Sequence, residues 1–211
     1  MPRAVRAYDR KEIEFTRVLA FSDGVFAIAM TLLVVGIGIP TVREAQLGDA
    51  LRDLEPEIVS FFISFIVIGN YWLAHHRFFS QLARITSPLM LLNLGYLAAI
   101  AFVPFPTALV GKYTESPITV IIYAITLSFA SLLETVMFMV ACRSGSTRVP
   151  VPRDVARYGV IASLLPVLVF IVSIPIALAS ATWALLSWLL VFPAERVLER
   201  RKPSGTDKAF L

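Results

Sequence analysis

Long runs without charge are the feature of this sequence that most constrains its fold. No Asp, Glu, Lys or Arg occurs in residues 24–42, 58–74, 85–111 or 158–194, and residues 116–142 contain only Glu134. About 20 mostly apolar residues are enough for a helix to cross a bilayer, and continuous apolar runs are atypical of the alternating strands of a membrane barrel. The last run is long enough for two short spans with a turn near residues 177–182. The sequence therefore predicts an all-α membrane protein with six transmembrane helices, at about 20–40, 57–76, 87–111, 117–141, 157–177 and 180–194.

Composition and charge agree with this fold and exclude other classes. The chain is 57% hydrophobic and 16% charged, whereas soluble domains average about 45–50% and 25%, so a water-soluble enzyme is excluded. Sixteen of the 19 Lys and Arg residues lie in residues 1–20, 75–87, 142–157 and 193–211. This bias predicts that both termini are cytoplasmic. We expect a cytoplasmic N-terminal segment over 1–19, a six-helix transmembrane domain over 20–194 and a basic cytoplasmic tail over 195–211. We expect the tail beyond Arg201 to be disordered. The net charge of +4 then reflects membrane orientation, and no nucleic-acid partner is expected.

Polar residues gather in the inner half of four predicted spans. Polar groups in a membrane are costly and mark functional or packing sites. We expect a hydrogen-bonded cluster that either locks the helices together or relays protons or ions. No metal or cofactor is expected: the one cysteine, Cys142, excludes a multi-cysteine site, and adjacent histidines point about 100° apart on a helix. The residues concerned are Ser22, Asp23, Asn70, Trp72, His75, His76, Asn93 and Glu134.

The first span carries a stripe of residues at helical spacing. Ile28, Thr31 and Val35 follow one another at intervals of three and four residues, between Gly24 and Gly38 on the same face. Periodicity by itself favours contact of this stripe with lipid or a neighbouring helix.

The entrance of the first span resembles a known family signature. Arg17, Phe21, Ser22 and Asp23 are similar to the Arg-x-x-x-Phe-Ser-Asp motif of the transmembrane protein 175 family. Gly24 stands where some members have Ala. The cluster of Trp72, His75 and His76 also resembles that family.

The resemblance implies a fold and a function. It implies that six-span repeats surround one pore, that single-repeat chains form homotetramers, and that the first helix lines the pore. It further implies that Ile28 forms the constriction, followed by layers at Thr31 and Val35. Expected partners are other copies of the chain, membrane lipid and permeant monovalent cations.

We therefore expect a passive, potassium-permeable channel with an apolar gate and filter. It should be an integral, multi-pass protein of a prokaryotic inner membrane, not an enzyme. The alternative is a proton-coupled transporter or proton-permeable channel that uses Asp23, His75, His76 and Glu134.

Overall fold

The computed structural model describes residues 10–203, and within them the chain is helical throughout apart from its connections. The predicted N-terminal segment and basic tail fall partly outside this range, at residues 1–9 and 204–211. The elements are α1 (Arg10–Leu32), the 3₁₀ turns η1 (Leu33–Gly36) and η2 (Glu44–Gln46), α2 (Leu47–Asp53), α3 (Glu55–Ser80), α4 (Ser87–Phe102), α5 (Pro104–Lys112), α6 (Pro117–Ser144), α7 (Arg153–Ala179), α8 (Ala181–Ser187), η3 (Trp188–Leu190) and α9 (Val191–Glu199).

Six helical stretches in this range are long and apolar enough to cross a membrane, which confirms the predicted number of spans. Three of them are composite: α1 continues into η1, α4 into α5, and α8 through η3 into α9. The break between α4 and α5 comes at Val103, because Pro104 has no backbone N–H to continue the helical hydrogen bonds. The spans are Ile13–Gly36, Glu55–Ser80, Ser87–Lys112, Pro117–Ser144, Arg153–Ala179 and Ala181–Glu199.

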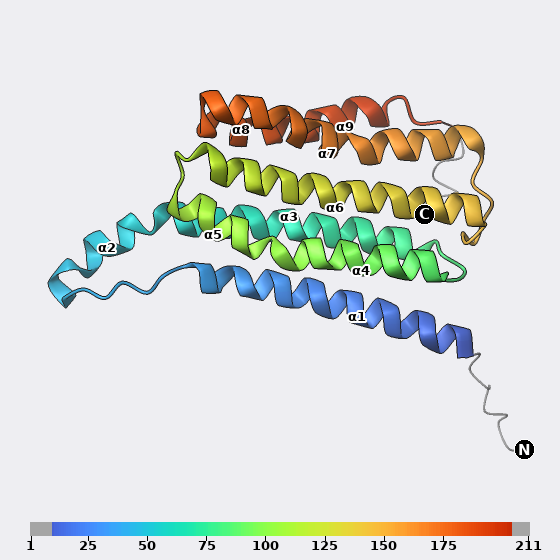
Figure 1. Ribbon diagram of the computed structural model, residues 1–211, viewed down its shortest axis with the longest axis horizontal. Coiled ribbons are helices and arrows are strands. Elements are labelled where there is room, and N and C mark those ends of the chain that lie inside the picture. The colour runs from blue at the N-terminus through green and yellow to red at the C-terminus, as the bar shows by residue number, and fades with distance from the viewer. Residues whose placement is uncertain (1–9, 204–211) are drawn as a thin grey trace, which may run out of the picture.

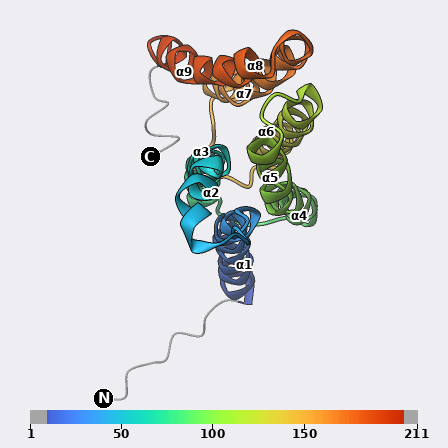
Figure 2. The same ribbon diagram turned by 90° about the vertical axis from the view of Figure 1, so that its left-hand side faces the viewer.

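The spans pack side by side with α1 on one side of the bundle and α7 to α9 on the other (Figures 1 and 2). Helix α1 contacts α3 and α4, while α4, α5 and α7 contact α6. Helices α8 and α9 pack chiefly on α7. The core consists of side chains between α1, α3, α4 and α6, centred on Phe26, Ile68, Tyr96, Ile100 and Leu127.

Two loops at one end of the bundle are hydrogen-bonded to each other. Ala83 N–H donates to the Ser146 carbonyl at 2.8 Å, and Arg148 N–H donates to the Gln81 carbonyl at 2.8 Å. The Arg84 guanidinium donates to the Ser144 carbonyl at 2.9 Å. These bonds tie the α3–α4 connection to the α6–α7 connection, and so join the half of the bundle that holds α1 to the half that holds α7.

The same end of the molecule collects the basic segments, and we call it the basic end. It holds the start of α1, both connected loops, the start of α7 and the end of α9 (Figure 1). The opposite end, the far end, holds the excursion that includes α2 (Figure 1). The far end carries Arg43, Arg52 and Lys112.

Gly145 ends α6 in a left-handed conformation, with φ +58°. Side chains with a Cβ atom pay about 1–2 kcal/mol in this region, and Asn pays less than most. We predict that Gly145→Val lowers the free energy of unfolding by about 1–2 kcal/mol, measured as a lower thermal midpoint in detergent. Gly145→Asn is the control and should lose less. Equal midpoints for the Val variant and the unaltered protein would contradict this role of Gly145.

Candidate functional site

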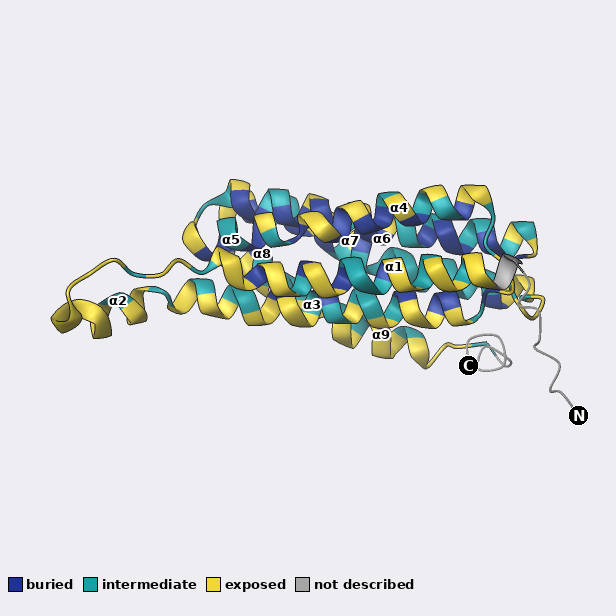
Figure 3. Ribbon diagram, turned by 90° about the horizontal axis from the view of Figure 1, so that it is seen from below, coloured by how far each residue is buried: buried dark blue, intermediate teal, exposed yellow. Residues whose placement is uncertain are grey.

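One face of α1, and of the 3₁₀ turn η1 that continues it, is left uncovered by the rest of the chain. Ile28 is 60% exposed and Val35 is 74% exposed, and Thr31 between them is exposed as well. The opposite face is buried in the core and consists of Ser22, Phe26, Ala29 and Leu33. Figure 3 views the molecule from the side of α1 and shows exposed residues along this helix. We call Ile28, Thr31 and Val35 the α1 stripe.

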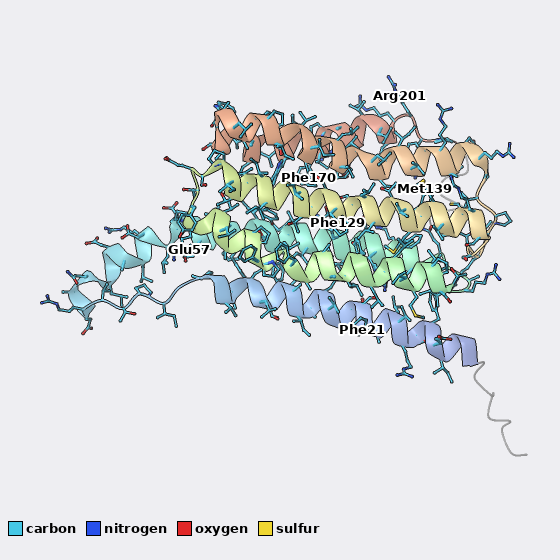
Figure 4. All side chains as sticks on the ribbon, viewed as in Figure 1. Phe21, Glu57, Phe129, Met139, Phe170 and Arg201 are labelled. Carbon is cyan, nitrogen blue, oxygen red and sulfur yellow. The ribbon has the colours of Figure 1, made fainter. Side chains whose placement is uncertain are left out.

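The stripe extends toward the basic end through Phe21 and Arg17, which are also exposed. Figure 4 shows Phe21 on the side of α1 that faces away from the bundle. Arg17 forms no ion pair with Asp23 within the described residues, because six residues separate the two and they lie on different sides of the helix.

The α1 stripe carries one hydroxyl between two apolar side chains. The Thr31 hydroxyl donates to the Ile28 carbonyl at 2.9 Å. Its proton is therefore used within the helix, and the lone pairs of its oxygen remain available to a cation. Val35 follows Ile28 by seven positions, the last of them in η1, which is a rise of about 10–12 Å at 1.5 Å per residue in an α-helix and about 2 Å in a 3₁₀ turn.

A carboxylate fixes α1 against α3 near the basic end. The Trp72 indole N–H donates to Asp23 Oδ1 at 2.9 Å, and both side chains are half-buried. A hydrogen bond to a charged group stabilises a structure by about 1.5–3 kcal/mol. Because Asp23 projects sideways from the α1 stripe, this bond sets the rotation of α1 about its axis.

A second chain of hydrogen bonds joins α1, α4 and α3 beside this pair. The Ser22 hydroxyl donates to the Val18 carbonyl at 2.9 Å, so Ser22 accepts from the Asn93 amide at 3.0 Å. Asn93 Oδ1 must then accept, and it lies 2.9 Å from His75 Nε2. Because Asn93 Oδ1 accepts, His75 Nε2 must donate, so a neutral His75 carries its proton on Nε2.

His75 is enclosed by aromatic rings and closed to solvent. It is 1% exposed and stacks on Phe79, with ring centroids 4.1 Å apart, and on Tyr96. Its Nδ1 atom has no hydrogen-bond partner within the described part of the chain. The series of hydrogen bonds that starts at His75 ends on the Val18 carbonyl and does not include Asp23. Its geometry is that of a contact that holds helices together.

The polar residues that the sequence places at one depth do not form one cluster. Asn70 and His76 are exposed on α3, although the His76 ring lies 5.5 Å from the Trp72 ring. Glu134 on α6 is half-buried and makes no hydrogen bond or ion pair within residues 10–203. The structure brings together Asp23 with Trp72, and Ser22 with Asn93 and His75. The depth in the membrane that the sequence predicts does not tell these residues from polar residues on other helix faces.

The far end of α1 is held by contacts that sequence reasoning missed. The Gly38 N–H donates to Glu57 Oε2 at 3.2 Å, just beyond the 3₁₀ turn η1. Gly36 packs on Ala108, where an added Cβ would lie 3.1 Å from the Ala108 Cβ. Gly111 lies so close to Glu57 that an added Cβ would be 2.9 Å from its Cα. Figure 4 shows Glu57 at this end of the bundle.

Three further polar contacts join α3 to α5 and α6. The Ser64 hydroxyl lies 2.7 Å from the Tyr123 hydroxyl and 2.9 Å from that of Thr107. The Tyr71 hydroxyl lies 2.7 Å from that of Ser131. In the sequence, the presence of hydroxyl side chains within apolar spans is the feature that could have indicated these contacts between helices. Among residues 10–203, no three His, Cys, Asp or Glu side chains gather as metal ligands would.

Comparisons with known proteins point to one family. A family model described as endosomal/lysosomal potassium channel TMEM175 matches residues 17–104. A potassium channel of Streptomyces collinus is 46% identical over 101 residues, which are 47% of this chain and 49% of that protein. The endosomal/lysosomal proton channel TMEM175 of Bos taurus is 36% identical over 110 residues, which are 48% of this chain and 23% of that protein.

The fold is similar to that of a solved structure over nearly its whole length. A crystal structure of a lysosomal potassium-selective channel TMEM175 homologue from Chamaesiphon minutus matches with a TM-score of 0.74 and 28% identity. The match covers 89% of this chain and 97% of that one. By sequence, the chain spans about half the length of the bacterial relatives it matches.

The Asp23–Trp72 bond yields a prediction about folding rather than conduction. We predict that Trp72→Phe, which removes only the indole N–H donor, destabilises the folded protein by about 1.5–3 kcal/mol. The yield of folded, monodisperse protein on size-exclusion chromatography should fall, and any ion preference of the surviving protein should not change. Asp23→Ala should act in the same way.

The matched control is Trp183→Phe, since Trp183 is 68% exposed and stands apart from the core. This variant should behave like the unaltered protein. A Trp72→Phe or Asp23→Ala protein of normal yield with altered ion preference would show that the pair acts in the ion path instead.

Proposed function

We propose that this chain is a potassium-permeable ion channel of the TMEM175 family, whose model matches residues 17–104 and whose solved bacterial homologue has a similar fold. The relatives reported above are named as channels, not enzymes. The observation that carries the proposal is the α1 stripe. Three side chains at helical spacing remain uncovered on a helix whose opposite face is in the core.

The pore requires more than one copy of the chain. A single stripe is an open surface and encloses no path, so several α1 helices must face one another across an axis. We propose a homotetramer in which four α1 helices surround the ion path. The Ile28 side chains then form one apolar ring, with the Thr31 hydroxyls and the Val35 side chains as successive layers on the way to the far end.

The proposed ring of Ile28 side chains acts as both gate and filter. A narrow apolar constriction closes a pore by excluding water. When the ring widens, it supplies no oxygen ligands, so a cation passes with part of its hydration shell. Potassium holds its water less tightly than sodium and meets the lower barrier. The Thr31 oxygens replace part of the lost hydration. The selectivity for potassium is modest, because the sequence contains no Thr-Val-Gly-Tyr-Gly motif that would form a filter of backbone carbonyls.

The orientation follows from charge. Cytoplasmic ends of spans are enriched in Lys and Arg, so we place the basic end in the cytoplasm and the excursion with α2 outside. We further propose that the protein is an integral membrane protein of a prokaryotic cell membrane, because the potassium channels that it resembles are bacterial. The acidic residues of the excursion, among them Glu44 and Asp49, face the outer solution.

Proton permeation is the second candidate, because a relative is named as a proton channel. The hydrogen bonds favour passage of protons along the α1 stripe over a relay through His75. His75 is buried and its hydrogen bonds lead to the Val18 carbonyl. A relay through Asp23, His76 and Glu134 lacks a continuous chain of hydrogen bonds within the described residues.

The test of the channel proposal is ion flux through Ile28 variants. We predict that Ile28→Asn, in liposomes with a potassium gradient, gives a larger passive flux and a lower preference for potassium over sodium. The physical reason is that a polar ring stays wet when an apolar ring of the same width would be dry. Flux and reversal potential are measured in liposomes and planar bilayers.

The matched control is Val34→Asn. Val34 is 54% exposed, but it lies on a different side of the helix from Ile28 and Val35. Its variant should conduct like the unaltered protein. Unchanged conductance and reversal potential in Ile28→Asn would contradict the assignment of Ile28 as the constriction, and flux that strictly requires a proton gradient would favour a carrier.

A further inference from the structure

A hollow at the basic end lies between the start of α7 and the segment that follows α9. Its volume is about 550 Å³. It is open on one side, as expected for a groove at the surface of a membrane-spanning bundle. It is lined by Arg153, Asp154, Arg157, Tyr158, Ile161, Leu198, Arg201 and Pro203. Its lining residues belong to α7, to α9 and to the segment that follows α9, and these helices lie on the side of the bundle remote from α1 (Figure 2).

Three guanidinium groups from two distant parts of the chain converge on this hollow. Arg153 and Arg157 are one turn apart on α7, and Arg201 follows α9; all three lie in the lining. None of them forms an ion pair or a side-chain hydrogen bond within the described residues. Asp154 is the one carboxylate in the lining, which leaves an excess of positive charge. The planar guanidinium group suits phosphate, which it binds through two parallel hydrogen bonds.

The walls of the hollow change from polar to apolar along α7. Ile161 lies one further turn into the membrane span than Arg157, and Leu198 of α9 lines the same space. Ile161 is 47% exposed. A site with cationic groups at the end of a span and apolar side chains one turn deeper matches a phospholipid, whose phosphate lies at the end of its acyl chains. Basic pockets between helices at the cytoplasmic side are sites of this kind.

We propose that this hollow binds the headgroup of an anionic phospholipid of the inner leaflet. The phosphate accepts hydrogen bonds from Arg157 and Arg201, with Arg153 as a further cation at the rim. The acyl chains lie along Ile161 and Leu198. A bound lipid bridges α7 and the end of α9, and so holds the last span on the bundle in the membrane. The site is remote from the α1 stripe, and the proposal does not depend on the ion that the protein conducts.

The test compares lipid retention by the purified full chain. The protein is extracted in mild detergent with equal amounts of phosphatidylglycerol and phosphatidylcholine, and bound lipid is counted by native mass spectrometry. We expect the unaltered protein to retain phosphatidylglycerol preferentially. One cationic side chain near the membrane surface contributes about 1 kcal/mol, so Arg201→Gln should weaken retention about fivefold, and Arg157→Gln combined with Arg201→Gln should abolish the preference.

The matched control is Arg143→Gln, which removes one charge at the same end of the bundle, outside the hollow. It should retain phosphatidylglycerol like the unaltered protein. If Arg143→Gln loses as much phosphatidylglycerol as Arg201→Gln, the proposal is overturned in favour of a general attraction of the basic end to anionic lipid. If the double variant loses no phosphatidylglycerol, the proposal is overturned as well.

Two further measurements separate lipid binding from loss of fold and from binding of free phosphate. Arg201 follows the last helix, so Arg201→Gln should not change the thermal midpoint of the lipid-free protein. A lower midpoint would mean that the variant loses lipid because it is less stably folded, which would contradict the proposal. Inorganic phosphate at millimolar concentration should not displace phosphatidylglycerol, because it lacks acyl chains to contact Ile161 and Leu198. Displacement by phosphate would reject a lipid site.

Discussion

A carboxyl group within a membrane span needs a hydrogen-bond partner, and the partner of Asp23 fixes the rotation of the first helix about its axis. The bilayer core offers no water to hydrogen-bond polar groups, so they are satisfied within the protein or near its surface. The Trp72 indole meets Asp23, and this bond sets which face of α1 turns toward α3. The opposite face, with Ile28, Thr31 and Val35, is thereby turned outward.

The remaining contacts of α1 extend this constraint along its length. Asn93 and His75 hold Ser22 at one end, and Glu57 holds the Gly38 amide at the other. Between these two ends Phe26, Ala29 and Leu33 fill the core. A helix held at both ends and packed along one face presents a defined surface on the other. Such a surface can form a constriction whose width depends on the relative positions of whole helices in an assembly.

Much of this architecture could be predicted from the sequence, because it follows from one-dimensional patterns. Uncharged runs indicate the six spans, and intervals of three and four residues identify Ile28, Thr31 and Val35 as one face. The helices extend beyond the apolar runs: α1 already includes Arg10, ahead of the first apolar run, because a helix continues through charged residues that reach the headgroups or solvent.

The partners of the polar residues could not be predicted, because depth in the membrane does not specify direction. His75 and His76 are neighbours in sequence, yet one is in the core and the other is exposed. Glu57 belongs by sequence to an acidic stretch before the second apolar run, and only its hydrogen bond to Gly38 reveals that it supports α1. The hydroxyls of Ser64 and Tyr123 meet across 59 positions of sequence, a separation that no local pattern encodes.

The central claim is that the exposed face of α1 lines the ion path in an assembly of several copies. Cadmium block of potassium current tests it most directly, in a Cys142→Ser background with one new cysteine per chain. Thiolates from several copies around a narrow axis bind a soft metal ion together. We predict that micromolar cadmium blocks Ile28→Cys and leaves Val34→Cys conducting. Block of both variants alike, or of Val34→Cys alone, would contradict the claim.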